Sequence, residues 1–468
     1  MKMKRILAAA MAAAMLLTGC AAGPAPEGAD TDGRPVEDVG TMDMSASSDS
    51  AEAARPADGD AEPGMAPEMS QEDPVPGMVL EEPAESGITI AEEPANVEGP
   101  EDATPIQSDG MSALEKSAWL VDRARSGSDK NAMLSPLSLY MAMGMAAAGS
   151  RGDTRSELES FLGVDEDAFT DFMADVLAAT DDSYGSSLEL ANGIWTRAGG
   201  GELSDAYRET VEGKYRGRVE YAPMDQSTVD AVNRFADEST HGMIPNVLSE
   251  IPPDTLSILA NALYLDAPWL LPYEDWQVMD GMFHGAAGDR DAILMSSVEG
   301  TYMENAKATA FAKRYEGGYR FVGILPKEPG PFDLADLDLD GLLASETGSY
   351  DVDAVLPKFS FWDAYRLDPY LKELGLVLSF QDSADFGGAF VDGRSFHLDQ
   401  VAQAVRIETD EGGTKAAAVT TIMAPANAAM AEPRERRSVV LDRPFAFIIQ
   451  GPGIDLPLFV GVVEDPAV

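Results

Sequence analysis

The chain has 468 residues, and its 33 Lys and Arg against 81 Asp and Glu give a formal net charge of −48. A charge this negative repels phosphate backbones, which excludes nucleic acid from the expected partners. The single cysteine excludes a disulfide framework and any metal site built from several thiolates. Three histidines, His241, His284 and His397, leave little room for histidine-based catalysis. We interpret each as a surface or structural side chain, and we expect neither a metal nor a cofactor.

Residues 1–19 have the pattern of a targeting segment. Positive charges within residues 2–5 precede an apolar run, 6–17, that is too short to span a membrane stably. The run ends in Leu17-Thr18-Gly19-Cys20, which resembles the bacterial lipoprotein box. The resemblance implies cleavage before Cys20, lipid attachment to its thiol, and an extracytoplasmic protein anchored to the bacterial cell envelope. An ordinary signal peptide with a chance cysteine is the alternative.

Residues 20–110 have a different composition. Between residues 21 and 110 there are 23 acidic and 2 basic residues, 12 of the 30 prolines and no aromatic residue. Low hydrophobicity combined with like charge cannot bury enough apolar surface to offset the loss of chain entropy. We therefore predict a disordered tether with a mean extent of roughly 50 Å or more. A plain spacer is the preferred interpretation, and a partner-binding segment is the alternative.

Residues 111–468 contain no internal repeat and no second linker, so we expect one folded domain. Helical apolar spacing covers residues 113–126. Ser135-Pro136 has the order of an N-cap followed by proline at the first helical position, and it predicts a helix over 137–148 closed by Gly149.

Two further helix starts follow along the chain. Thr154 and Glu157 have the spacing of a capping box for a helix that ends at Gly163, and Ser227 is a plausible cap for a helix that runs to Thr240. Strand-like runs cover residues 256–265, 319–325, 352–361, 401–408, 445–450 and 458–463. This mixture of helices and long strands predicts an α+β fold with large sheets.

Eight segments of this domain resemble serpin motifs in family order and spacing. The first is NAMLSPLSLYMAMGMAAAGSRGDTRSEL at 131–158; the others are 232–248, 259–273, 315–326, 356–361, 384–386, 441–449 and 457–466. On these residues the chain is identified as a member of the serpin family over nearly all of 111–468. The resemblance implies the serpin fold, with three β-sheets, about eight or nine helices and an exposed reactive-centre loop at about 411–440.

Family membership alone does not imply inhibition, because some serpins only bind hormones, act as chaperones or serve as storage proteins. The stretch ETDEGGTKAAAVT at 408–420 resembles the hinge of inhibitory serpins. In such serpins a protease cuts the loop and becomes acylated, and the N-terminal side of the loop then inserts into the main sheet as a new central strand. The hinge positions that match the family are Glu411, Gly413, Thr414, Ala416, Ala417 and Ala418.

The residue types of the hinge suit insertion. Gly413 has no Cβ and can swing freely. Period-two alternation places Thr414, Ala416 and Ala418 on one face of the inserted strand, and all three are small. Lys415 falls on the other face, where solvent can take its charge. A helix-prone filler in an exposed loop is the alternative interpretation of the alanines.

The scissile bond is placed by a family count. Counting Glu411 as the first of seventeen residues reaches Asn427, which predicts cleavage at Asn427–Ala428. The loop is a few residues longer than usual, so Ala426–Asn427 and Met430–Ala431 are the alternative bonds. Small and medium neighbours suit elastase-like or subtilisin-like serine proteases. Arg434, Arg436 and Arg437 would attract trypsin-like enzymes, for which we expect substrate behaviour.

Further positions match the family singly. Ser135, Ser138 and Asn261 match the polar shutter that controls sheet opening, and Gln403 stands where the family usually has histidine. A glutamine can replace a neutral histidine as donor and acceptor. In the breach, where the loop begins to insert, Trp269 matches the conserved tryptophan and Lys358 matches the lysine that pairs with the hinge glutamate, here Glu411.

The sequence therefore predicts a protease inhibitor and not an enzyme: an irreversible suicide inhibitor of serine proteases that traps its target covalently. No G-x-S-x-G, H-E-x-x-H or P-loop motif supports catalysis. The expected partners are a target serine protease and, through lipidated Cys20, a membrane, and we expect a monomer. The alternative is a non-inhibitory serpin that acts as a surface binding or structural lipoprotein.

Overall fold

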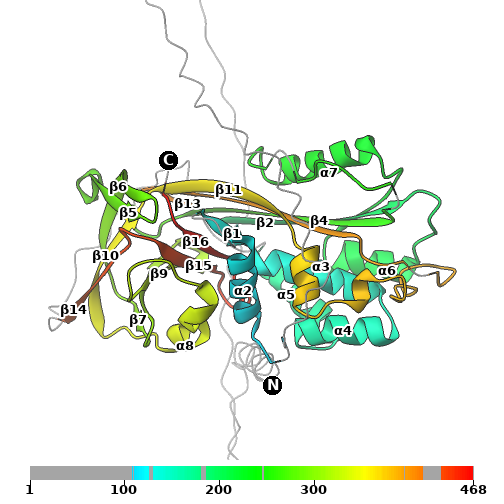
Figure 1. Ribbon diagram of the computed structural model, residues 1–468, viewed down its shortest axis with the longest axis horizontal. Coiled ribbons are helices and arrows are strands. Elements are labelled where there is room, and N and C mark those ends of the chain that lie inside the picture. Colours follow the sequence, from blue (N-terminus) through cyan, green and yellow to red (C-terminus); the bar gives the residue numbers. More distant parts are fainter. Residues whose placement is uncertain are drawn as a thin grey trace, which may run out of the picture. The chain divides into compact units, whose positions relative to one another are not determined.

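The computed structural model describes residues 108, 110–125, 130–180, 186–244, 247–253, 255–394, 396–414 and 434–466. The helices of this part of the chain are seen in Figure 1. Eight of them are α-helices: α2 (Ala113–Arg125), α3 (Pro136–Gly149), α4 (Gly152–Leu162), α5 (Glu166–Thr180), α6 (Asp205–Glu209), α7 (Gln226–Ser239), α8 (Leu339–Ala344) and α9 (Asp368–Glu373).

The described strands form three sheets, and we call the first of them the main sheet. Its order is β11 (Phe359–Arg366), β12 (Gln400–Thr409), β13 (Gly413–Thr414), β4 (Ser257–Pro268), β2 (Ser187–Arg197) and β3 (Arg218–Ala222). The second sheet has the order β1 (Ala132–Leu134), β16 (Phe459–Val463), β15 (Phe445–Gln450), β9 (Arg320–Pro326), β8 (Ala308–Arg314) and β7 (Tyr302–Glu304). The third has the order β14 (Glu435–Val440), β10 (Tyr350–Pro357), β6 (Gly288–Glu299) and β5 (Val278–Gly285). The predicted α+β class with large sheets is confirmed.

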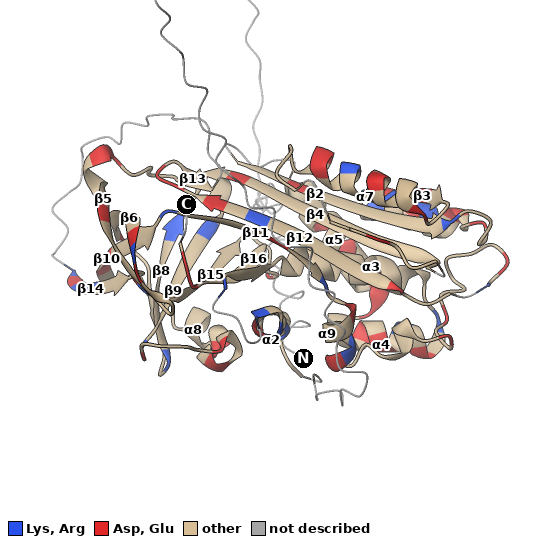
Figure 2. Cartoon of the chain, turned by 45° about the horizontal axis from the view of Figure 1, so that its top comes forward, with Lys and Arg blue, Asp and Glu red and all other residues tan. Residues whose placement is uncertain are grey.

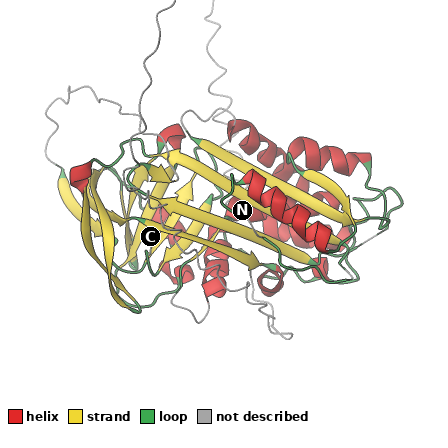
Figure 3. Ribbon diagram, turned by 90° about the horizontal axis from the view of Figure 1, so that it is seen from above, coloured by secondary structure: helices red, strands yellow, loops and turns green. Residues whose placement is uncertain are grey.

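The main sheet has helices on both faces, and α7 covers only part of the outer one. Helix α7 lies across its outer face (Figures 1 and 3), where Val232 and Phe235 of the helix pack in one apolar cluster with Ala260 and Ala262 of β4. On the inner face, α3 is buried along almost its whole length, because its many Ala and Met side chains leave no polar face. Neighbouring strands of the sheet thus run between two apolar layers, as a strand inserted there would also have to do.

The capping box predicted at Thr154 and Glu157 is wrong. Helix α4 begins at Gly152 without a side-chain cap. The Glu157 carboxylate instead accepts hydrogen bonds from the backbone N–H groups of Val377, Leu378 and Ser379, at 2.7–2.8 Å. The spacing of Thr154 and Glu157 fits a capping box. The Glu157 carboxylate nevertheless binds three backbone N–H groups of a distant segment and not the first turn of α4.

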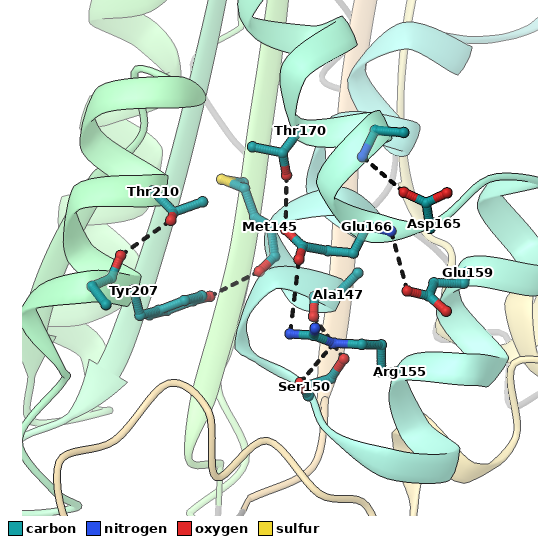
Figure 4. A network of polar contacts seen from close by, with 12 residues as sticks. Met145, Ala147, Ser150, Arg155, Glu159, Asp165, Glu166, Thr170, Tyr207 and Thr210 are labelled. Carbon is teal, nitrogen blue, oxygen red and sulfur yellow. Dashed lines mark hydrogen bonds and ion pairs between the residues drawn. The ribbon is translucent and has the colours of Figure 1, made fainter.

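A network of polar contacts joins the helices below the main sheet (Figure 4). Arg155 of α4 donates from Nε to the Ser150 carbonyl at 3.0 Å, and its guanidinium lies 3.8 Å from the Glu166 carboxylate of α5. Thr170 donates to Glu166 at 2.8 Å, and the Tyr207 hydroxyl donates to the Met145 carbonyl of α3 at 3.1 Å. These bonds fix α3, which carries the shutter serines at its start, to the helices around it.

The boundaries of two other elements differ from the predicted ones, because strand pairing and a side-chain cap determine them. The run 352–361 is split at Lys358, because β10 pairs with β6 and β14 whereas β11 pairs with β12 in another sheet. Helix α7 is capped by Asp225, whose side chain accepts from the Ser227 N–H at 2.9 Å, and not by Ser227 itself. Within the described residues, no helix has the length and apolar character needed to cross a membrane.

Candidate functional site

The main sheet is parted at one end between β4 and β12, and we call the line between these two strands the seam. The strands run parallel and pair directly over five registers, from Ile258 with Gln400 to Ala262 with Ala404. Beyond these registers they diverge, and the two residues of β13 lie between them. Thr414 pairs with Thr409 of β12, and both β13 residues pair antiparallel with the end of β4.

The hinge, residues 410–414, turns the chain from β12 into β13. Asp410 shapes this turn: its N–H donates to the Gly413 carbonyl at 2.9 Å, and its Oδ1 accepts from the N–H groups of Gly412 and Gly413. A Cβ at Gly413 would lie 2.3 Å from the Ala267 carbonyl oxygen of β4, so only glycine fits this close approach. Thr414 is 3% exposed, and its hydroxyl lies 2.6 Å from that of Tyr315.

Trp269 lies directly against the hinge. Its ring stacks on Tyr315 with a centroid distance of 4.1 Å and an interplanar angle of 6°. Its Nε1–H donates to the Asp410 carbonyl at 2.9 Å and its backbone N–H to the Gly412 carbonyl at 2.8 Å. The Tyr273 N–H donates to the Glu411 carbonyl at 3.0 Å. Three hinge carbonyls are thus held by two residues of the segment that follows β4.

The structure brings Lys358 and Glu411 together as an ion pair at the same end of the seam. The hydrogen bond from Lys358 lowers the pKa of the Glu411 carboxyl. The Glu411 side chain is 47% exposed, so solvent screens the pair and its contribution to stability is small. The position of this ion pair matters more than the free energy it contributes, because the pair connects the first residues after β12 to the start of β11.

The shutter lies at the directly paired part of the seam. Gln403 of β12 accepts from the Ser135 N–H and donates to the Ser135 carbonyl, both at 2.9 Å. The Ser138 N–H donates to the Ser135 hydroxyl at 3.3 Å, which caps α3. Asn261 does not bond to either serine; its amide donates to Asn192 Oδ1 of β2 at 2.5 Å.

Two polar atoms of the shutter lack a hydrogen-bond partner among the described residues. Among the residues that the structure describes, Ser138 Oγ and Asn261 Oδ1 are buried without a hydrogen-bond partner. A buried acceptor without a partner costs about 1–3 kcal/mol. The directly paired part of the seam thus leaves two buried polar atoms of this cluster without a partner.

Comparison with known proteins identifies the fold. The sequence model of the family described as Serpin (serine protease inhibitor) matches residues 119–466. The chain belongs to the serpin family. It is 28% identical over 370 residues to an uncharacterized serpin-like protein of Thermococcus kodakarensis, covering 76% of this chain and 85% of the relative. Iripin-8 of Ixodes ricinus is also 28% identical over 370 residues, with 74% and 90% covered.

A solved structure agrees with this assignment. The crystal structure of the thermophilic serpin Tengpin in its native state matches with a TM-score of 0.66 at 27% identity, over 78% of this chain and 97% of Tengpin. The three sheets and eight described helices are those of the serpin fold, which confirms the fold implied by the sequence motifs. Serpins are in general protease inhibitors and not catalytic enzymes.

Some predicted site residues lie outside the described residues. They are the hinge alanines Ala416, Ala417 and Ala418, the candidate reactive bonds at Ala426, Asn427, Ala428 and Met430, and the lipid-attachment residue Cys20. Their roles therefore stay predictions. The described hinge, breach and shutter residues all lie along one seam.

Sequence reasoning missed four residues of this site. Asp410 shapes the hinge turn, Tyr315 supports Trp269 and bonds to Thr414, Tyr273 holds a hinge carbonyl, and Asn192 binds Asn261. The run Asp-Glu-Gly-Gly is a turn signal that could have indicated Asp410. The other three act through tertiary contacts that no local pattern reveals.

Proposed function

We propose that this serpin is an irreversible suicide inhibitor of serine proteases that traps its target by inserting the cleaved loop into the main sheet. The observation that carries the proposal is strand β13. Gly413 and Thr414 are already the first two residues of a strand between β4 and β12, antiparallel to both. Insertion would continue a strand that exists and would not have to start a new one.

The registers define how far the inserted strand would extend. Thr414 lies opposite Ala267 of β4 and Thr409 of β12. Continuing the same antiparallel register residue by residue brings Met423 opposite Ile258 and Gln400, which are themselves partners at the last direct register of the seam. Residues 415–423 thus match the length of the seam, and the first proline of the loop, Pro425, falls just beyond it. A proline inside the ladder would remove a hydrogen bond.

The chemistry of the seam suits this strand. Residues 258–262 and 400–404 contain no charged side chain, in keeping with the mainly uncharged central strands in Figure 2. In the sequence that would enter there, 419–423, there is no charge either. Separating and re-pairing the strands would therefore desolvate no charged group.

The same register offers a partner for the shutter. Thr420 would fall between Asn261 and Gln403, on the inner face that Thr414 occupies at the hinge. Its hydroxyl can both donate and accept, so it suits the unpartnered Asn261 Oδ1 and Ser138 Oγ. Insertion would then satisfy polar atoms that the closed seam leaves without partners.

The family count gives Asn427–Ala428 as the proposed reactive bond. Met423 would reach the far end of the seam, and Asn427 follows four residues later. A protease acylated at Asn427 would thus be carried the whole length of the main sheet. Small neighbouring residues favour elastase-like or subtilisin-like serine proteases, with Ala426–Asn427 and Met430–Ala431 as alternative bonds.

We also propose where this inhibitor acts. Residues 1–19 would be removed as a lipoprotein signal peptide, Cys20 would carry the lipid, and residues 20–110 would form the acidic tether of a monomeric serpin domain, 111–468, outside the cytoplasm of a bacterium. The support is the pattern around Cys20 and the composition of the tether. Labelling of the chain and of its Cys20→Ser variant with a fatty-acid analogue in cells tests this part, since only the first should be labelled.

The inhibitory mechanism is tested by mixing the chain with pancreatic elastase and separating the products on a denaturing gel. A stable band at the summed mass is expected, and mass spectrometry of the released C-terminal peptide identifies the cleaved bond. Cleavage without that band, also with subtilisin-type and trypsin-type enzymes, would contradict inhibition. It would favour the alternative of a non-inhibitory surface binding or structural serpin.

A further inference from the structure

A buried lysine lies behind the hinge. Lys313 of β8 is 4% exposed, and its Nζ lies 3.1 Å from Glu299 Oε1 of β6 and donates to the Leu271 carbonyl at 3.1 Å. The same ammonium lies 4.2 Å from the ring centroid of Tyr273 and 5.4 Å from that of Trp269. These two aromatic residues are the ones whose N–H groups hold the hinge carbonyls.

We call the segment 269–273 the hinge cradle. It is held by the last two residues of β8 and the residue that follows them. Trp269 forms an isolated bridge with Tyr315, and the Leu270 N–H donates to the Arg314 carbonyl at 2.9 Å. Lys313 supplies the third contact, through the Leu271 carbonyl. The Leu271 contact comes from the side chain of Lys313, so a substitution at Lys313 can remove it while the backbone contacts and the stack of Trp269 on Tyr315 remain.

We propose that Lys313 is a positioning residue of the hinge, because its ammonium fixes the hinge cradle so that the Trp269 and Tyr273 N–H groups face the carbonyls of Gly412 and Glu411. The chain of contacts runs from Lys313 to the cradle and from the cradle to the hinge. The consequence for inhibition rests on the proposed function: a hinge held in the sheet keeps the first registers of the inserted strand formed before the loop is cut.

The chemistry of the site supports an orienting role over simple packing. The neighbouring β8 residues Phe311 and Ala312 are buried and apolar, so an aliphatic side chain at 313 would pack there without desolvating a charge. Burial lowers the pKa of the Lys313 amine, and the Glu299 carboxylate opposes this effect. Ser297 donates to Glu299 Oε1 at 2.7 Å, which holds the carboxylate toward the ammonium. Apart from Glu299, the described partners of Lys313 all belong to the cradle.

The test compares Lys313→Met with a matched control, Lys116→Met, in the full chain. Lys116 of α2 is also 4% exposed, donates to the Phe161 carbonyl at 2.7 Å and lies 4.9 Å from the Phe161 ring, but it contacts neither the cradle nor the hinge. Amide hydrogen exchange of the uncut protein, read by mass spectrometry of peptides that cover 267–275 and 408–414, reports opening of the cradle without any protease.

We expect Lys313→Met to accelerate exchange in both peptides by at least about tenfold relative to wild type, while Lys116→Met leaves them unchanged. Equal exchange in the two variants would overturn the proposal and leave Lys313 a structural ion pair. If Lys313→Met does not fold, Glu299→Gln removes the countercharge at nearly constant shape, and a smaller acceleration confined to the same peptides is expected; no acceleration there would also overturn it.

A second measurement separates this inference from the proposed function. The ratio of serpin consumed to protease trapped should rise severalfold in Lys313→Met, because a released hinge inserts more slowly and more loops are cut without trapping. If wild type traps no protease while the exchange result holds, the inhibitory function fails and the positioning role stands. If wild type traps protease and Lys313→Met matches it in both assays, the positioning role fails alone.

Discussion

The two ends of the seam between β4 and β12 differ in how completely their polar groups are satisfied. At the hinge end, β13 fills the space between the strands, and the carbonyls of Asp410, Glu411 and Gly412 all accept hydrogen bonds. At the shutter end the strands pair directly, yet Asn261 Oδ1 and Ser138 Oγ are buried without partners among the described residues.

Under the proposed mechanism, this difference indicates which part of the sheet would change on insertion. The hinge end already has the arrangement that a full insertion would extend, so it needs to move little. The shutter end has a closed ladder, which the proposed insertion would have to break, and its two unpartnered polar atoms would lower the cost of breaking it. In the proposed mechanism, the pairing of β13 would be the first step and the opening of the shutter would be the second.

The largest expected effect comes from blocking the hinge end. Thr414→Arg puts a charge at a position that is 3% exposed and faces the interior, so β13 cannot form and the cut loop cannot insert. We expect loss of the covalent complex, by at least about a hundredfold in the fraction of protease trapped, with cleavage of the loop retained. Denaturing gels after reaction with elastase measure both.

The control is Lys415→Glu, because alternation along the proposed inserted strand would place this side chain on the outward face. It should still trap protease, because its side chain need not be buried. Normal trapping by Thr414→Arg, or equal loss in both variants, would show that the inward face of the hinge does not control insertion.

The next largest effect is expected from reversing the charge of Glu411, whose ion pair with Lys358 lies at the hinge end of the seam. Glu411→Lys replaces the ion pair with Lys358 by two like charges and should release the hinge, so that the loop of one molecule inserts into the seam of another. We expect loop–sheet polymers on native gels after mild heating. Only monomer under those conditions, with Glu411→Gln run alongside, would count against this role of the pair.

At the shutter end, Gln403→Ala leaves the Ser135 N–H buried without its partner and removes one of the two hydrogen bonds that the Ser135 carbonyl accepts, the other coming from the Leu139 N–H. The expected loss of stability is about 1–3 kcal/mol, measured by denaturant unfolding of the uncut chain. Gln403→His should recover part of it above pH 6.5, where a neutral imidazole offers one donor and one acceptor. Equal stability of the Ala variant and wild type would mean that this contact does not hold the seam closed.

The smallest expected effect is a pH dependence of the hinge pair. Lys358 lowers the pKa of Glu411 below its ordinary value of 4.5, so the pair contributes fully above pH 4.5 and is lost as the pH falls through the lower folded value. Because the pair is exposed, the contribution is at most about 1 kcal/mol. The stability difference between wild type and Glu411→Gln should shrink below pH 4.5, and a difference that grows there would contradict this sign.

The sequence predicted the fold class and several elements well where local patterns or family motifs specify them. The α3 cap at Ser135 and the 445–450 strand agree with the structure because each depends on nearby residues. The Glu157 cap failed because its partners are about 220 residues away along the chain. Lys313 showed no signal for the same reason: in the sequence it is one charge beside an apolar run, and only the tertiary fold puts it behind the hinge.

The most direct test of the account is the thermal unfolding of the chain before and after one cut in the loop by a small amount of subtilisin. Insertion of residues 415–423 adds a ladder of backbone hydrogen bonds worth about 1 kcal/mol each, so the midpoint should rise by more than about 10 °C. A midpoint that stays the same or falls after the cut would contradict the claim that the seam accepts the loop.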